Sequence, residues 1–168
     1  MNLGLLKAIY ISFLGTLIYQ STLCQRIIPL HFPEKISKRV AVVIEDSDNF
    51  LWIGTNFGLY QYDAERIIKF LSSNSTHSIP DNNVLCLAED NNSNIWIGTE
   101  GGIALFNKKS ETTIFPGNWI EGLNGTITSI KYNNLTGKMF ICNNKGEIFI
   151  LSKGSQFNIE KIKLLRNT

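Results

Sequence analysis

The feature that most constrains this chain is an internal repeat with a period of 44 residues. Residues 40–63, "VAVVIEDSDNFLWIGTNFGLYQYD", align without a gap with residues 84–107, "VLCLAEDNNSNIWIGTEGGIALFN". The two copies share a tryptophan, a threonine and two glycines at matching positions: Trp52 and Trp96, Thr55 and Thr99, Gly54 and Gly98, and Gly58 and Gly102. A fixed period of about 20 to 50 residues is typical of folds in which one supersecondary unit stacks on the next. The repeat therefore determines the architecture.

A third and weaker copy occupies residues 127–152, "ITSIKYNNLTGKMFICNNKGEIFILS". Phe140 stands where the first two copies have tryptophan, and Cys142 stands where they have the first glycine. Gly146 retains the second glycine, and one residue is inserted in the "NNLTGK" loop. The chain is therefore expected to contain three units of one structure.

Each copy is expected to fold into four short strands. In the first copy, turn-rich pieces such as "EDSDNF", "TNFG" and "DAE" separate apolar segments, which places the strands at residues 40–44, 51–55, 58–62 and 66–70. Segments such as "LWIG" and "IALF" are continuously apolar, as in strands that are covered on both faces. Four antiparallel strands per repeat of this length indicate the blades of a β-propeller. We therefore predict an all-β fold of about three four-stranded antiparallel blades.

A single blade cannot bury its own faces, so Trp52, Trp96 and Phe140 are expected to fill the seams between neighbouring blades. A platform for stacking a sugar ring is the alternative interpretation of the two tryptophans. The predicted division of the chain is a signal peptide at 1–24, the outer strand of the closing blade and a loop at 25–39, and blades at 40–83, 84–126 and 127–168, the last with the C-terminal tail.

The glycine-rich sequence "GTEGG" at residues 98–102 raises the question of a phosphate-binding loop. "TNFG", "TEGG" and "NNKG" occupy the same place in the three copies, and only the fourth residue is always glycine. This pattern predicts a hairpin turn that closes on a residue with positive φ. A phosphate loop would require a strand that leads into a helix, and no helical period follows. The sequence therefore predicts a bend.

Residues 1–24 have the pattern of a secretory signal peptide, with Lys7, the apolar run "AIYISFLGTLIY" and the small polar group "QSTLC". The apolar run is shorter than the roughly 20 residues that span a bilayer, and an uncleaved anchor is the alternative. Cleavage is expected near Cys24, and the bulky Leu23 before it disfavours a lipid on that cysteine. The remaining chain would carry 15 basic and 14 acidic side chains, a balance that does not favour nucleic-acid binding.

No catalytic, metal or cofactor site is predicted. The two histidines, His31 and His77, stand far apart in the sequence, and it contains no zinc or nucleophile motif. An exported chain could form a disulfide between Cys86 and Cys142. The repeat instead places each cysteine where a small apolar residue packs.

Acidic residues recur in the first turn of the first two copies. Asp46, Asp48 and Asp90 could coordinate calcium, but the turns lack the closing glutamate of an EF-hand loop, and aspartates that bond to their own backbone are expected instead. Glu45 and Glu89 could act as paired carboxylates in glycoside hydrolysis, but their equivalent positions favour a structural role. Four sequons would carry glycans only in a eukaryotic secretory pathway: Asn74, Asn91, Asn124 and Asn134.

The second copy closely resembles a known family. Residues 78–106 contain, in order, "S-x-P-x-N-x-V", the hairpin "EDxxxxxWIGT" and the strand "GxxxF". Residues 40–62 contain the hairpin again, followed by the same strand with Tyr62 in place of the phenylalanine. This order resembles the two-component regulator propeller repeat, which occurs in the periplasmic sensor region of hybrid two-component histidine kinases of Bacteroidetes. The resemblance covers roughly residues 26–152, in which "RIIPLHF" is similar to the outer strand that closes such rings.

The resemblance implies a periplasmic propeller, normally seven-bladed, ahead of a membrane span, a histidine kinase and output domains. With about three blades, this chain is expected to be an N-terminal fragment of the sensor that lacks those later parts, and its open blade faces are expected to promote self-association. The usual signals of the family are oligosaccharides, but no ligand-contacting residue can be assigned from the repeat. The alternatives are a free-standing exported propeller that binds a glycan or a protein partner, and a hydrolase or lyase on a propeller scaffold.

Overall fold

The computed structural model describes residues 39–73, 78–118, 120–152 and 158–163. Several predictions of the sequence fall outside the described residues: the signal peptide, the outer strand of the closing blade, Cys24, His31, Asn74 and His77.

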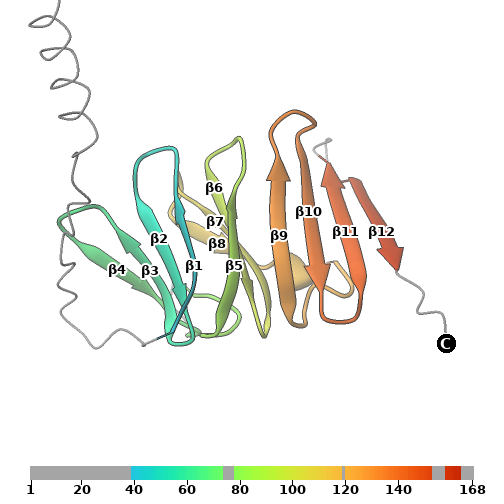
Figure 1. Ribbon diagram of the computed structural model, residues 1–168, viewed down its shortest axis with the longest axis horizontal. Helices are drawn as coiled ribbons and strands as arrows, with labels where there is room; N and C mark the ends of the chain where they lie inside the picture. Colours follow the sequence, from blue (N-terminus) through green and yellow to red (C-terminus); the bar gives the residue numbers. More distant parts are fainter. Residues whose placement is uncertain (1–38, 74–77, 119, 153–157, 164–168) are drawn as a thin grey trace, which may run out of the picture. The chain divides into compact units, whose positions relative to one another are not determined.

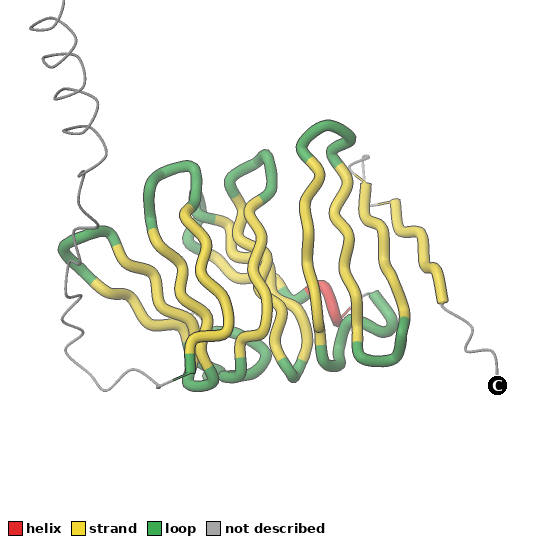
Figure 2. Tube along the Cα trace, in the orientation of Figure 1, coloured by secondary structure: helices red, strands yellow, loops and turns green. Residues whose placement is uncertain are grey.

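The described residues form three four-stranded antiparallel sheets, in each of which the strands follow one another in space as they do in the chain (Figure 1, Figure 2). The first sheet contains β1 (Val40–Glu45), β2 (Leu51–Thr55), β3 (Gly58–Tyr62) and β4 (Ile67–Phe70). The second contains β5 (Val84–Glu89), β6 (Asn94–Thr99), β7 (Gly102–Asn107) and β8 (Thr112–Ile114), followed by the short 3-10 helix η1 (Pro116–Asn118). The third contains β9 (Ile127–Asn133), β10 (Lys138–Asn143), β11 (Glu147–Ser152) and β12 (Asn158–Lys163). The predicted all-β fold of three four-stranded antiparallel units is confirmed.

The strands of the first sheet lie close to their predicted bounds. β2 and β3 have the bounds that the turn signals indicate, and β1 continues one residue further, to Glu45. β4 begins at Ile67 rather than Arg66. The backbone N–H of Arg66 donates to the side chain of Asp63, so Arg66 belongs to the turn instead of the strand ladder.

Neighbouring sheets pack along two seams, with β5 beside β1 on one side and beside β9 on the other (Figure 1). The first seam lies between the first and second sheets, and its core contains Trp52, Leu59, Phe70, Ile95, Ile97, Ala104 and Phe106. The second seam lies between the second and third sheets, and its core contains Trp96, Leu105, Met139, Ile141, Phe149 and Leu151. Trp52 and Trp96 are 0% and 1% exposed, so each tryptophan buries nearly all of a surface of about 150–250 Å² against the next sheet.

The first repeated glycine allows neighbouring sheets to approach closely. A Cβ atom on Gly54 would lie 2.7 Å from Cγ1 of Val84 in β5, and a Cβ atom on Gly98 would lie 2.8 Å from Cγ2 of Ile127 in β9. Both distances are far shorter than the optimal carbon–carbon separation of about 3.5–4.0 Å. A side chain at either glycine would push away the first strand of the next sheet.

The second repeated glycine forms the hairpin bend. Gly58, Gly102 and Gly146 have φ angles of 117°, 137° and 74°, which favour glycine. The hydroxyl groups of Thr55 and Thr99 donate to the carbonyl oxygens of Gly58 and Gly102 at 2.9 and 2.8 Å. "GTEGG" leads directly into strand β7, so it is a bend between two strands, as the repeat predicts.

Phe140 occupies the tryptophan position of the third repeat but is less buried than the two tryptophans. It is half-buried and belongs to neither core. Its neighbours Met139 and Ile141 face the second seam, and side chains alternate along a strand, so Phe140 lies on the opposite face of the third sheet. The described residues provide no fourth sheet on that side, and Phe140 therefore does not fill a seam as expected.

Candidate functional site: the first seam

An aspartate in the first turn of each of the first two sheets holds the repeated tryptophan. Asp46 accepts hydrogen bonds through Oδ1 from two backbone N–H groups of its own turn, and through Oδ2 from Nε1 of Trp52 at 2.8 Å. Asp90 repeats this arrangement, with Nε1 of Trp96 at 2.9 Å. Both aspartates thus accept hydrogen bonds from the backbone of their own turn and from a buried indole. The bonds to the turn backbone are the structural role that the sequence predicts.

Lys108, directly after β7, joins the two sheets across the first seam. Its Nζ lies 3.0 Å from Oδ2 of Asp46, 2.7 Å from Oδ2 of Asp48 and 2.9 Å from Oε1 of Glu89. Glu89 also accepts hydrogen bonds from the backbone N–H and the hydroxyl of Ser47, at 2.8 and 2.6 Å. The ammonium group therefore links carboxylates of both sheets. We call these five residues the lysine clamp.

The contacts of the lysine clamp shift the pKa values of Asp46 and Lys108. Burial by itself would raise the pKa of Asp46, but hydrogen bonds from the Trp52 indole, from the turn backbone and from Lys108 outweigh it and lower the pKa. Burial would likewise lower the pKa of Lys108, but its hydrogen bonds to the three carboxylates hold the pKa above its ordinary value. Lys108 and Asp46 are therefore both charged near neutral pH.

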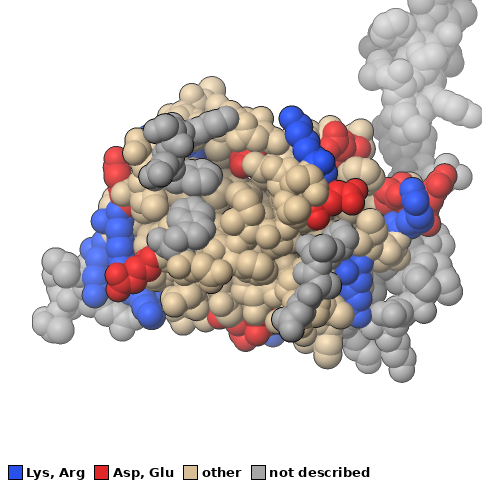
Figure 3. Space-filling view, turned by 180° about the vertical axis from the view of Figure 1, so that it is seen from behind, with Lys and Arg blue, Asp and Glu red and all other residues tan. Residues whose placement is uncertain are grey.

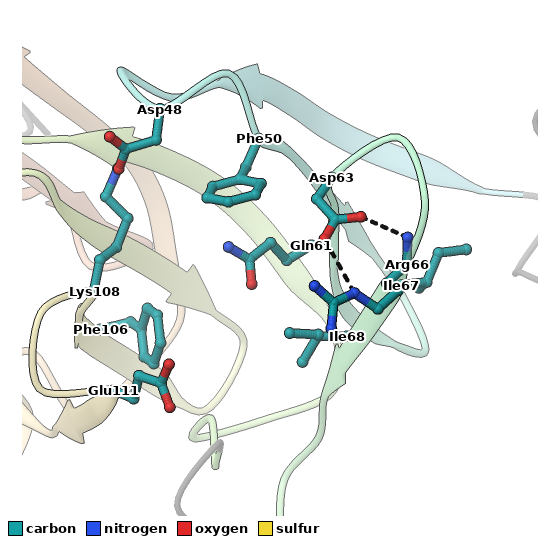
Figure 4. Close-up of a pocket in the computed structure, with 10 residues that line it drawn as sticks. All are labelled: Asp48, Phe50, Gln61, Asp63, Arg66, Ile67, Ile68, Phe106, Lys108 and Glu111. Carbon is teal, nitrogen blue, oxygen red and sulfur yellow. Dashed lines mark hydrogen bonds and ion pairs between the residues drawn. The ribbon is translucent and has the colours of Figure 1, made fainter.

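Beside the lysine clamp the first seam opens into a cavity of about 650 Å³ (Figure 4). It lies between the turns and outer strands of the first sheet and the β7–β8 turn of the second. Its lining is Asp48, Phe50, Gln61, Asp63, Arg66, Ile67, Ile68, Phe106, Lys108 and Glu111. The cavity therefore combines aromatic, aliphatic, amide and charged groups from two sheets.

The apolar wall of the cavity is anchored in the core of the first seam. The ring of Phe106 packs against Trp52 and Phe70, with centroids 5.7 and 5.1 Å apart. Phe50 is partly buried against the same core, and Figure 4 shows its ring above the space that Phe106 bounds from below. Because this wall belongs to the core, it is held in place before any ligand binds.

The polar groups of the cavity are in part without partners. Among the described residues, neither the Gln61 amide nor the Glu111 carboxylate forms a hydrogen bond or ion pair. The side chain of Arg66 is 82% exposed, and its Nε lies 3.5 Å from Oδ2 of Asp63. Figure 4 shows the Gln61 amide and the Arg66 guanidinium pointing into the space between the two phenylalanine rings. The cavity therefore offers free donors and acceptors.

The second seam has a smaller counterpart of this cavity, with a volume of about 70 Å³. Asn94 stands where the first repeat has Phe50, and its amide donates to Oδ2 of Asp90 at 3.0 Å. Leu105 stands where the first repeat has Gln61, and it is buried in the core. The polar, open character of the first seam is therefore specific to that seam.

The remaining candidate residues of the sequence have structural roles or no assigned contact. Glu45 is exposed at the end of β1, while Glu89 is engaged by the lysine clamp. Cys86 and Cys142 are free thiols, and burial raises the pKa of Cys86 to about 12. Cys86 thus packs as a small apolar residue.

Other classes of site are absent from the described part of the chain. It contains no group of three or more His, Cys, Asp or Glu side chains that could hold a metal ion. None of its helices is long and apolar enough to span a bilayer.

On the face drawn in Figure 3, acidic and basic side chains of the described residues are interspersed around the margin, and uncharged side chains occupy the middle.

Sequence reasoning did not single out Phe50, Gln61 or Lys108. The signal that could have found the first two is a mismatch within an otherwise regular repeat, since asparagine and leucine replace them 44 residues later. Lys108 lies just beyond the aligned residues 84–107, and its partners are on the β1–β2 turn of the first sheet and at the end of β5 in the second, so its role appears only in the folded chain.

The stacked four-stranded meanders define a protein of the β-propeller repeat class. The model of the family described as "Two component regulator propeller" matches residues 35–57 and 78–101. The first two repeats of this chain are therefore two-component regulator propeller repeats, as their sequence motifs indicated. A search of curated proteins finds no match.

Several solved structures share the fold of this chain. The extracellular domain of BT3049 from B. thetaiotaomicron, described as a hybrid two component system, matches with a TM-score of 0.64 and 23% identity over 86% of this chain and 20% of that chain. The extracellular domain of BT4673 from the same organism matches with a TM-score of 0.54 and 20% identity over 73% and 18% of the two chains. A streptogramin B lyase matches with a TM-score of 0.54 and 17% identity over 77% and 43%. The chain thus spans about a fifth of the two extracellular domains.

Proposed function

We propose that this chain is part of the extracellular ligand-sensing propeller of a hybrid two-component sensor, and that its signal is an oligosaccharide. The match of the family model to both of the first two repeats carries the proposal. The descriptions of BT3049 and BT4673 as extracellular domains of such systems support it. A cavity with free polar groups in the first seam also supports a ligand-binding role.

In this proposal residues 1–24 direct the chain to the periplasm, and the kinase and output domains lie outside these 168 residues. A ligand shifts a conformational equilibrium only by its difference in affinity for the two states. A ligand held between two sheets contacts both, so its affinity depends on how they are arranged. Binding would thereby favour one arrangement of the sensing region and bias the kinase across the membrane.

The sensor role is tested by the DNA that follows the codon for Thr168. Further propeller repeats, a membrane span and a histidine kinase in that DNA would support the sensor. Neighbouring DNA without any kinase would contradict it and favour a free-standing exported binding protein.

The oligosaccharide signal is tested separately, by incubating the full chain with a glycan array. Binding to at least one class of oligosaccharide is expected. A folded chain that binds none of them would contradict this part of the proposal, and circular dichroism verifies the fold in the same preparation.

A further inference from the structure

We propose that the cavity of the first seam is a subsite for one uncharged sugar ring of the ligand, recognised by Phe50, Gln61 and Glu111. This inference rests on the proposed function, because it names the site and the ligand class of the same sensing role. Four features of the cavity support it: the volume, the aromatic wall, the free polar groups and the charge.

The size and wall of the cavity fit a sugar ring. Small-molecule sites in proteins have volumes of about 300–1,000 Å³ and are mostly apolar with a few placed polar groups. The volume here, about 650 Å³, lies within this range. A pyranose presents C–H groups on its faces and hydroxyl groups around its edge. The half-buried ring of Phe50 can pack against such a face, and Phe106 closes the space below it.

The free polar groups match hydroxyl groups better than they match a cation. The side-chain amide of Gln61 offers two donors and an acceptor, the Glu111 carboxylate offers acceptors only, and the exposed guanidinium of Arg66 offers donors. A sugar hydroxyl is both a donor and an acceptor, so it can use all three groups. An ammonium group has no acceptor and would leave the Gln61 and Arg66 donors without partners.

The charge of the site disfavours acidic glycans. Three carboxylates and two cations line the cavity, and the carboxylates of Asp46 and Glu89 lie against one of these cations, Lys108. The site as a whole therefore carries a net negative charge, which disfavours ligands of the same sign. A sulfated or uronic acid saccharide would meet this repulsion, whereas a neutral saccharide would not.

The second seam shows that these groups are not needed to build a blade. The second repeat folds with Asn94 in place of Phe50 and with Leu105 in place of Gln61, and its cavity is only about 70 Å³. A blade therefore folds without a phenylalanine and a glutamine at these two positions. From this contrast we assign Phe50 and Gln61 to ligand binding rather than to folding.

The contrast also supplies the test variants, since each takes the residue that the second repeat already accommodates. The full chain and the variants Phe50→Asn and Gln61→Leu are titrated with cellotetraose, maltotetraose and mannotetraose as neutral probes, and with tetragalacturonate and a chitosan tetramer as acidic and cationic probes. Asn92→Ala, which alters the cavity of the second seam, is the matched control. Binding is measured by saturation-transfer NMR and calorimetry, and the fold by circular dichroism.

At least one neutral probe is expected to bind the full chain, with an affinity that falls at least tenfold in each first-seam variant and does not change in Asn92→Ala. Neutral binding that survives both first-seam substitutions would overturn the subsite and leave the proposed function standing. Stronger binding of the acidic or cationic probe would overturn the uncharged class of ligand. A folded chain that binds no saccharide would overturn both this inference and the oligosaccharide signal.

Discussion

The two seams of the molecule are built from the same repeat but differ in what they add to it. In both, a turn aspartate holds the buried indole of the seam tryptophan at 2.8–2.9 Å. The first seam surrounds Trp52 with two phenylalanine rings and crosses the sheets with the lysine clamp. The second seam packs Trp96 among Leu105, Met139, Phe149 and other buried side chains and has no cavity of comparable size beside it. The repeat thus specifies the stacking, and the residues that vary between copies specify the chemistry of each seam.

The largest expected effect is the loss of a seam tryptophan. Trp52→Ala and Trp96→Ala should each lower the free energy of unfolding by about 3–5 kcal/mol, since each removes a large buried ring. In Trp52→Ala the loss includes the tilted contacts of the indole with the rings of Phe70 and Phe106. Urea unfolding followed by far-ultraviolet circular dichroism measures both.

Phe57, whose side chain is 59% exposed, provides the control for this comparison. Phe57→Ala should change the free energy of unfolding by less than about 0.5 kcal/mol. A loss in either tryptophan variant as small as that of Phe57→Ala would contradict the role of the seam tryptophans in stability.

The second largest effect should come from removing the cation of the lysine clamp. Lys108→Met should lower the free energy of unfolding by about 2–3 kcal/mol, because it leaves the fully buried Asp46 carboxylate without its counterion. The neighbouring Lys109 is exposed, so Lys109→Met is a matched control with the same change in net charge. A similar loss in both variants would mean that net charge, rather than the lysine clamp, accounts for the effect.

An acid titration should separate the charge of the first seam from its packing. The fold lowers the pKa of Asp46 below its ordinary value of 3.8, so this group contributes stability above the unfolded pKa and loses it as pH falls through the folded pKa. Between about pH 5 and pH 2, the wild-type chain should therefore lose about 1 kcal/mol more than Asp46→Asn. The free energy of unfolding is measured across this range in urea.

Glu65→Gln serves as the control for the acid titration, because Glu65 is exposed and lies outside the lysine clamp. It should retain the steeper acid dependence of the wild-type chain. The assignment to Asp46 would be refuted by an Asp46→Asn variant whose stability falls with pH as steeply as that of the wild type.

The fold could be predicted from the sequence because its determinants recur. Trp52 and Gly54 repeat 44 residues later, and their recurrence indicates a buried ring and a close approach of two sheets at each seam. The candidate site could not be predicted in this way, because Phe50 and Gln61 lie at positions where the two copies differ. A mismatch can mark such a position, but it does not tell what the side chain there contacts. Lys108 finds its partners only once two sheets are stacked, so its role depends on tertiary structure.

The smallest expected effect concerns the polar contact beside Trp96. Asn94 donates to Oδ2 of Asp90 at 3.0 Å, next to the bond from Trp96. Asn94→Ala should lower the free energy of unfolding by about 0.5–1 kcal/mol, since it removes one partly buried hydrogen bond, and Asn91→Ala, an exposed neighbour, should have no measurable effect. A loss as large as that of Lys108→Met would contradict this expectation, because the bond between Asn94 and Asp90 lies within the second sheet, whereas Lys108 joins two sheets.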